Sequence, residues 1–184
     1  MSTGNAALCD QQKSVLVAVD LQERLLAAMP AMDAVLQRSA LLLHAARLLD
    51  VPLLSTTQYA RGLGAIHPKL LEAIPAPIDK TGFSCVRAPE FAAQLEVLRR
   101  PQVVLCGVEA HVCILQTAMD LLARGMTLFI VEDAVASRDP LNKRNALCRL
   151  RAAGAWITNS ESVIFEWLRD ARHDHFKALS GLLR

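Results

Sequence analysis

The segment from Cys106 to Thr117, CGVEAHVCILQT, contains two cysteines in different settings. Cys106 lies within an apolar run typical of a buried strand, so we interpret it as a core residue. Cys113 follows this run near the start of a predicted helix, where the positive end of the helix dipole favours a thiolate. Cys113 is therefore a candidate nucleophile, and the alternative is that it packs in the core as most free cysteines do.

Two more reactive side chains end predicted strands. Asp20 ends the apolar run that starts at Ser14, and Lys80 ends a short run that starts at Pro77. In an open α/β sheet, ligands bind beyond the carboxyl ends of the strands, so Asp20, Lys80 and Cys113 should share one edge. An ammonium lowers the pKa of a nearby thiol, and a carboxylate accepts its proton and later activates water. These three residues predict a site for covalent hydrolysis.

The other cysteines and the nearest histidine give weaker predictions. Cys148 lies mid-helix among leucines and is interpreted as core, Cys9 lies in the N-terminal tail, and Cys85 follows no helix start. His111 does not face Cys113, because residues two apart point to different sides of a helix. We expect His111 to line the mouth of the site or to contact a neighbouring subunit.

Two pairs of polar residues remain open. His173 and His175 are either metal ligands or solvated side chains of a charged terminus. Glu23 and Arg24, after the first strand, either bind substrate or pair with each other on the surface. Spacing alone assigns neither pair a role.

Strands and helices alternate along the chain. The predicted strands are Ser14–Asp20, Val51–Gln58, Pro77–Lys80, Val103–Gly107, Thr127–Ala134 and Ala155–Thr158. The predicted helices are Asp33–Leu49, Ala88–Arg100, His111–Gly125, a helix from Asp139 to Gly154 and one from Glu161 onward. No hairpin signal separates the strands, so the pattern predicts a parallel sheet with helices on both faces. We expect one domain over residues 1–184, with residues 1–13 as a loose tail.

The composition argues against several classes of protein. Hydrophobic residues make up 53% of the chain and the formal net charge is only +2, so no basic face for nucleic acid is expected. The apolar runs are too short to span a membrane, and no targeting signal is visible. The five cysteines include no CxxC pair, which favours the reducing cytoplasm over a disulfide scaffold or structural zinc. The high apolar content also predicts a homo-oligomer.

Two common motifs are absent from the sequence. The turn after the first strand reads DLQER and contains no GxGxxG, so a dinucleotide-binding fold is not supported. The chain contains no GxSxG, so a serine α/β-hydrolase is not supported either.

The chain resembles the isochorismatase-like cysteine hydrolases, in particular the short isochorismatase-domain and YcaC-related amidohydrolases. The matching motifs are VLVAVDLQE, STTQYARGLG, DKTGFSC, LCGVEAHVCILQTAMDLLARG and VEDAVASR, in this order between about Ser14 and Ser160. The resemblance implies a three-layer α/β/α fold with a six-stranded parallel sheet of Rossmann-type strand order 3-2-1-4-5-6. It also implies a catalytic triad of Asp20, Lys80 and Cys113.

The resemblance further implies how the site works. A cis peptide bond between Val108 and Glu109 would help the backbone N–H groups of Glu109 and Cys113 to form an oxyanion hole. Asp20 would take the thiol proton, and the thiolate would attack a carbonyl to give a thioester that water then cleaves. Lys80 would hold the charges in place.

Departures from related families narrow the expected substrate. Nicotinamidases carry a metal site with an acid and histidines after the second strand, but TTQYARGLGAIHP contains only His67, so neither metal nor cofactor is expected. True isochorismatases lack the nucleophilic cysteine, so Cys113 argues against vinyl-ether hydrolysis. The residues placed to line the pocket are Leu21, Leu25, Gln58, Tyr59, Phe83 and His111. A partly apolar pocket of this kind suits a small amide or related acyl compound.

Two functions from other classes stay open. The chain could be an oligomeric binding or assembly protein whose triad is idle. It could also be a thiol redox sensor, since a cysteine of low pKa oxidises readily, although no resolving cysteine is evident.

Overall fold

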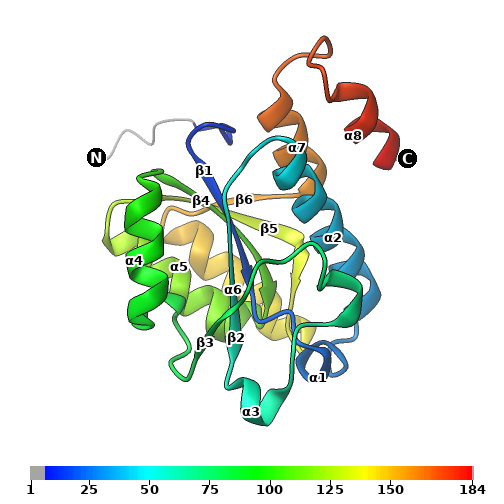
Figure 1. The fold of residues 1–184 in the computed structure, drawn as a ribbon. Coiled ribbons are helices and arrows are strands. Elements are labelled where there is room, and N and C mark those ends of the chain that lie inside the picture. Colours follow the sequence, from blue (N-terminus) through cyan, green and yellow to red (C-terminus); the bar gives the residue numbers. More distant parts are fainter. Residues whose placement is uncertain (1–6, 184) are drawn as a thin grey trace.

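The computed structural model describes residues 7–183, and its centre is a six-stranded sheet in the order β3-β2-β1-β4-β5-β6 (Figure 1). The strands are β1 (Ser14–Val19), β2 (Leu53–Gln58), β3 (Ile78–Lys80), β4 (Gln102–Val108), β5 (Thr127–Ala136) and β6 (Trp156–Thr158). Neighbouring strands all pair in parallel. The predicted parallel sheet and its strand order are therefore confirmed.

Helices cover both faces of this sheet (Figure 1). They are α1 (Glu23–Leu26), α2 (Met32–Leu48), α3 (Ala60–Leu63), α4 (Pro89–Leu98), α5 (Leu115–Ala123), α6 (Pro140–Ala152), α7 (Ser160–Leu168) and α8 (Phe176–Leu182). Short 3₁₀ turns, η1 (Pro68–Leu70) and η2 (Cys85–Arg87), lie in the connections on either side of β3. Asp139 caps α6 by accepting from the Leu141 N–H at 2.8 Å, as its place before Pro140 predicts.

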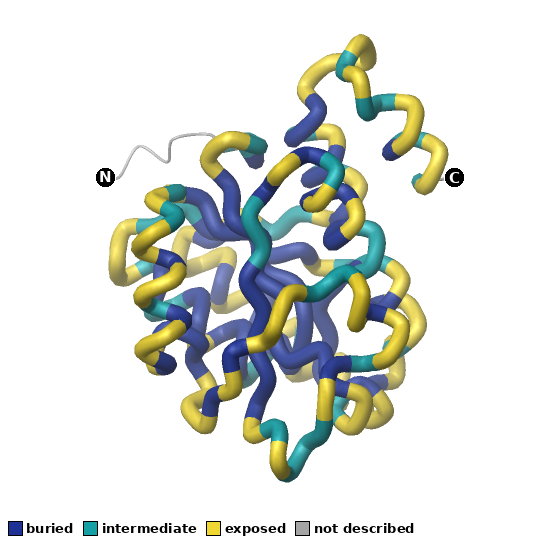
Figure 2. Tube along the Cα trace, in the orientation of Figure 1, coloured by how far each residue is buried: buried dark blue, intermediate teal, exposed yellow. Residues whose placement is uncertain are grey.

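The two faces of the sheet bury separate apolar clusters. On β1, Leu16 and Ala18 belong to the cluster beneath α2 and α7, whereas Val15 and Val17 belong to the cluster beneath α4, α5 and α6. Figure 2 shows the central strands buried and the exposed residues on the outer sides of the helices. Because helices cover both faces, the three-layer fold is confirmed.

The prediction of a loose N-terminal tail is wrong for residues 7–13, while residues 1–6 lie outside the described part. Cys9 is fully buried, and its backbone N–H donates to Glu166 Oε2 at 2.6 Å. Arg169 Nη2 donates to the Cys9 carbonyl at 2.8 Å. Both partners come from the far end of the chain, so the local pattern around Cys9 could not reveal this packing.

Three predictions for the C-terminal half need correction. Cys148 is exposed rather than core, because Ala146, Leu147 and Leu150 form the buried face of α6. The helix expected from Glu161 onward is two helices, α7 and α8, separated by residues 169–175. β5 continues to Ala136 and thus extends beyond its expected end.

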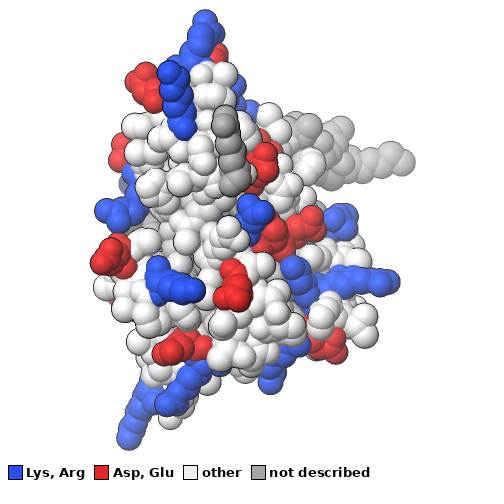
Figure 3. Space-filling model, turned by 90° about the vertical axis from the view of Figure 1, so that its right-hand side faces the viewer, with Lys and Arg blue, Asp and Glu red and all other residues white. Residues whose placement is uncertain are grey.

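The surface carries charges of both signs. In the view of Figure 3, lysine and arginine side chains are interspersed with aspartate and glutamate. Within residues 7–183, no helix combines the length and the apolar character that crossing a membrane requires.

Candidate active site

The side chains of Asp20, Lys80 and Cys113 meet beyond the carboxyl ends of β1, β3 and β4. Lys80 Nζ lies 2.8 Å from Asp20 Oδ2 and 3.6 Å from Cys113 Sγ. The exposed fraction is 0% for Asp20, 4% for Lys80 and 5% for Cys113. The ammonium is thus in contact with both the carboxylate and the thiol, and all three groups are shielded from bulk water.

The backbones of β1 and β4 approach each other closely at this edge. Asp20 has a φ of 52°, a left-handed conformation that is uncommon for residues other than glycine. Gly107 has a φ of 118°, and a Cβ at this position would lie only 2.0 Å from the Val19 carbonyl oxygen. Only glycine fits there, so β4 can pass close to β1 just before the segment that carries Cys113.

Two residues at the end of β2 hold the charged pair. Thr56 and Gln58 are two positions apart, so their side chains lie on the same face of the strand. Thr56 Oγ1 donates to Asp20 Oδ1 at 2.7 Å, and Gln58 Oε1 accepts from Lys80 Nζ at 2.6 Å. Gln58 Oε1 also lies 3.8 Å from Cys113 Sγ. Asp20 and Lys80 are therefore each fixed by a second polar partner.

Three residues of this region are not identified by sequence patterns as parts of the site. Besides Thr56, they are Gln22, which is fully buried, and Cys85, whose Sγ lies 3.7 Å from Thr56 Oγ1. Gln22 Nε2 donates to the Gly64 carbonyl at 2.7 Å, and Gln22 Oε1 accepts from the Gln58 N–H at 2.7 Å. The sequence signal that could have identified two of them is their position: Thr56 is a polar residue near the end of β2, and Gln22 is a polar residue shortly after the end of β1.

Burial and charge act in opposite directions on Lys80. Burial works to lower the pKa of its ammonium, but the net direction is upward, with the neighbouring Asp20 carboxylate as the main cause that raises the pKa. Lys80 therefore keeps its proton at neutral pH and balances the charge of the Asp20 carboxylate.

The surroundings of Cys113 differ from the expectation of a ready-made thiolate. Burial raises the pKa of the thiol and the charge of Asp20 raises it further, whereas Lys80 lowers it and a hydrogen bond to Asp20 raises it. The helical start is a π-helix, η3 (Ala110–Ile114), and α5 begins only afterwards. The net direction is upward, so the expected lowering of the pKa is wrong. The resting sulfur is a neutral thiol beside a carboxylate that can accept its proton.

The segment before Cys113 is anchored to the connection between β5 and α6. The peptide bond between Val108 and Glu109 is cis. The Glu109 carboxylate accepts from the Arg138 backbone N–H at 2.9 Å and from Arg138 Nε at 3.1 Å. His111 Nδ1 lies 2.9 Å from Ser137 Oγ, so His111 has a partner within its own chain.

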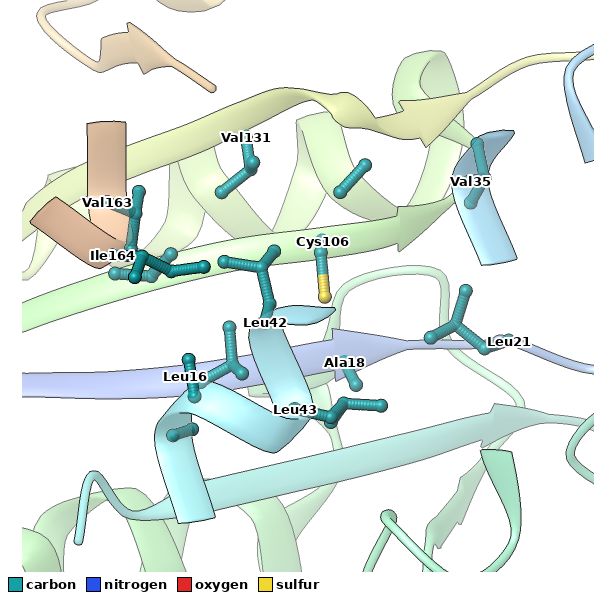
Figure 4. Packing of buried hydrophobic residues seen from close by; sticks show 14 of the residues in the cluster. Leu16, Ala18, Leu21, Val35, Leu42, Leu43, Cys106, Val131, Val163 and Ile164 are labelled. Atoms are coloured by element: carbon teal, nitrogen blue, oxygen red, sulfur yellow. The ribbon is translucent and has the colours of Figure 1, made fainter. Parts of the chain in front are cut away.

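The residues expected to line the pocket differ in their exposure. Tyr59 is 50% and Phe83 is 51% exposed, so both rings are accessible. Leu25 is partly buried against the cluster beneath α2. Leu21 is fully buried in that cluster (Figure 4), so the prediction that it lines the pocket is wrong. The chain turns at Asp20, and the next side chain points into the core.

The remaining polar candidates have other surroundings. Arg24 Nη1 donates to the Gly62 carbonyl at 2.8 Å. The rings of His173 and His175 have their centroids 5.7 Å apart. Across residues 7–183, no group of three His, Cys, Asp or Glu side chains is arranged to hold a metal ion.

Known proteins share both the sequence and the fold of this chain. The isochorismatase domain matches residues 14–162. Isochorismatase domain-containing protein 2A of Mus musculus is 40% identical over 174 residues, which cover 94% of this chain and 84% of that protein. The structure of MAR1 ribonuclease from Caenorhabditis elegans is 37% identical with a TM-score of 0.90, covering 96% of this chain and 92% of that one.

Two YcaC structures, each 25% identical, are also similar. YcaC from Pseudomonas aeruginosa, solved with hexane-2,5-diol and covalent acrylamide, has a TM-score of 0.87 and covers 97% of this chain and 96% of its own. YcaC from Escherichia coli, an octameric hydrolase of unknown specificity, has a TM-score of 0.90, and the match covers 97% of this chain and 90% of that one. Because the isochorismatase domain matches residues 14–162 and a relative that carries this domain is 40% identical to the chain, the chain belongs to the isochorismatase family.

Proposed function

We propose that this protein is a metal-independent cysteine hydrolase that cleaves a small amide or related acyl compound through a thioester. The observation that carries the proposal is the position of Lys80 Nζ, 2.8 Å from Asp20 Oδ2 and 3.6 Å from Cys113 Sγ in a buried cluster. A nucleophile, a base and a counter-charge are the groups that covalent hydrolysis needs.

The reaction starts with transfer of the Cys113 proton to Asp20. The thiolate attacks the substrate carbonyl, and the backbone N–H groups of Glu109 and Cys113 form the oxyanion hole for the tetrahedral intermediate. Protonated Asp20 returns the proton to the leaving amine, and the carbon–nitrogen bond breaks to give a thioester. Asp20 then takes a proton from water, and the hydroxide attacks the thioester to release the acid and restore the thiol.

Lys80 contributes charge rather than a proton. Since the charges around it raise its pKa, its ammonium persists at neutral pH and stabilises the thiolate and the Asp20 carboxylate in turn. The neutral resting thiol does not favour the alternative of a redox sensor, which depends on a thiolate of low pKa.

Small amides are the substrates to examine first. The Pseudomonas aeruginosa YcaC structure contains covalent acrylamide, which is itself a small amide. The exposed rings of Tyr59 and Phe83, with Leu25 and His111, are the residues we propose for the substrate contact. The octameric state of Escherichia coli YcaC supports a homo-oligomer, which a mass measurement by light scattering tests; a monomer would contradict it.

The decisive experiment measures ammonia release from a panel of small aliphatic and aromatic amides. We expect at least one amide to be hydrolysed by the parent protein and not by Cys113→Ala, with the fold of the variant checked by circular dichroism. Single-stranded RNA belongs in the same panel because the Caenorhabditis elegans structure carries the name ribonuclease, and we expect no cleavage of it. Equal activity of parent and Cys113→Ala would refute the proposed mechanism.

A further inference from the structure

The side chain of Gln58 finds partners for both ends of its amide within the chain. Nε2 donates to the Thr81 carbonyl at 2.7 Å, and Oε1 accepts from Lys80 Nζ at 2.6 Å. The residue is only 9% exposed. Each end of the amide therefore has a partner within the chain, and the side chain is fixed in place before any substrate binds.

The contact with Thr81 decides which end of the amide faces the triad. A carbonyl oxygen only accepts hydrogen bonds, so Nε2 faces Thr81 and Oε1 faces Lys80. The backbone of Gln58 is fixed as well, because its N–H donates to Gln22 Oε1 at 2.7 Å and its carbonyl accepts from Gln22 Nε2 at 3.2 Å. The amide oxygen is therefore directed at Lys80 with little freedom to turn.

An ammonium has three N–H donors, and Lys80 Nζ has three partners. They are Gln58 Oε1 at 2.6 Å, Asp20 Oδ2 at 2.8 Å and Cys113 Sγ at 3.6 Å. The contact with Gln58 is the shortest of the three. Without it, the ammonium would keep its strongest attraction, to Asp20, and would no longer be held at its present distance from the sulfur.

We infer that Gln58 is a positioning residue, which keeps Lys80 Nζ between Asp20 and Cys113. This inference rests on the proposed function of the triad. When the thiol gives up its proton, the new charge on sulfur needs the ammonium at contact distance. Gln58 Oε1 lies 2.6 Å from Lys80 Nζ but 3.8 Å from Cys113 Sγ, so its main action on the thiolate goes through Lys80.

The test follows alkylation of Cys113 by iodoacetamide as a function of pH, in a Cys148→Ser background that lacks the exposed thiol. Gln58→Met keeps the length of the side chain but has no oxygen for Lys80. We expect the alkylation rate to fall about tenfold at pH 7 and at each higher pH below the midpoint of the profile. An unchanged profile would overturn the inference.

The matched control makes the same substitution on the surface. Gln94 is exposed on α4, and Gln94→Met should keep the parent profile. If Gln58→Met does not fold, as judged by thermal unfolding, Gln58→Asn takes its place. Asn keeps an amide but withdraws its oxygen by one methylene, and we expect a shift in the same direction.

A double-mutant cycle separates action through Lys80 from a general structural effect. In a Lys80→Met background, Gln58→Met should change the alkylation rate by less than about twofold, because the group through which it acts is gone. An undiminished effect in that background would overturn the inference.

Alkylation does not require hydrolysis, so it distinguishes this inference from the proposed function. If no amide is hydrolysed but the alkylation profile shifts as expected, the proposed function fails and the role of Gln58 stands. With an active amide, Gln58→Met should lower kcat about tenfold and change KM less than about threefold. A raised KM at unchanged kcat would assign Gln58 to substrate binding instead.

Discussion

Cys106 and Cys113 are buried cysteines close together in the chain, but their surroundings are opposite. Cys106 lies in the apolar cluster between the sheet and α2, near Leu42 and Ala18 (Figure 4). Cys113 Sγ instead lies 3.6 Å from Lys80 Nζ, at the carboxyl edge of the sheet. Cys106 fills space in the apolar core at the centre of the sheet, whereas Cys113 lies beside charged side chains at the edge of the sheet.

Burial alone therefore does not distinguish an inert thiol from a reactive one. Burial raises the pKa of Cys106 to about 12, and it raises the pKa of Cys113 as well. Of these two thiols, only Cys113 lies beside charged groups: Lys80 Nζ is 3.6 Å from its sulfur, and Asp20, which pairs with Lys80, affects its pKa. The partners of the sulfur, more than its exposure, indicate the chemistry.

The largest expected effect is on hydrolysis. Cys113→Ala should lower the rate on any active amide by at least about a thousandfold, because the covalent route is lost. Cys106→Ala should leave the rate within about twofold, since its sulfur lies on the face of the sheet beneath α2. Steady-state ammonia release measures both. A large loss in Cys106→Ala, with the fold intact, would remove the distinction between the two thiols.

The next largest effect concerns how much the buried ion pair of Lys80 and Asp20 contributes to the stability of the fold. Lys80→Met removes the partner of a carboxylate that is fully buried, which should lower the free energy of unfolding by about 3 to 5 kcal/mol. Urea denaturation measures it, if the variant remains folded. Combining it with Asp20→Asn removes the orphaned charge and should restore part of the loss. A double variant less stable than Lys80→Met alone would contradict this account.

The strands and the three residues Asp20, Lys80 and Cys113 are predictable from the sequence because each depends on a local pattern. The run from Ser14 to Val19 is apolar and fully buried, and a polar residue that ends such a run marks the carboxyl edge of a parallel sheet. Asp20 and Lys80 are found in this way. Cys113 needs the further step of placing a helix start after β4.

Other features depend on contacts between distant segments, which local patterns do not contain. Cys9 is buried by its contacts with Glu166 and Arg169, and Thr56 matters only because Asp20 lies opposite it. The direction of the Cys113 pKa required the balance of burial against two charges of opposite sign. Leucine neighbours misled the interpretation of Cys148, since its own direction on α6 is outward.

A smaller effect compares the two thiols as packing groups. Cys106→Ala should lower the free energy of unfolding by about 1 to 2 kcal/mol, because removal of a fully buried sulfur leaves a cavity in a closely packed core. Cys113→Ala should cost less than about 1 kcal/mol, since the polar groups of Lys80 and Gln58 beside it can hold a water molecule in the space that the sulfur leaves. Urea denaturation of both variants against the parent gives the two values. The reverse order would mean that Cys113 is the packing residue.

The smallest effect is the pH dependence that the Cys106 thiol adds to stability. Its pKa of about 12 in the folded chain exceeds that of an unfolded thiol, about 8.5, so the folded state keeps a proton that the unfolded state releases. This contribution is fully present below pH 8.5 and is lost as the pH rises towards 12. Between pH 7 and 9, the parent should therefore lose about 1 kcal/mol more than Cys106→Ala. As a control, Cys148→Ser removes an exposed thiol, and its stability should change with pH as that of the parent does. Equal losses of stability in Cys106→Ala and in the parent would show that the core does not keep Cys106 protonated.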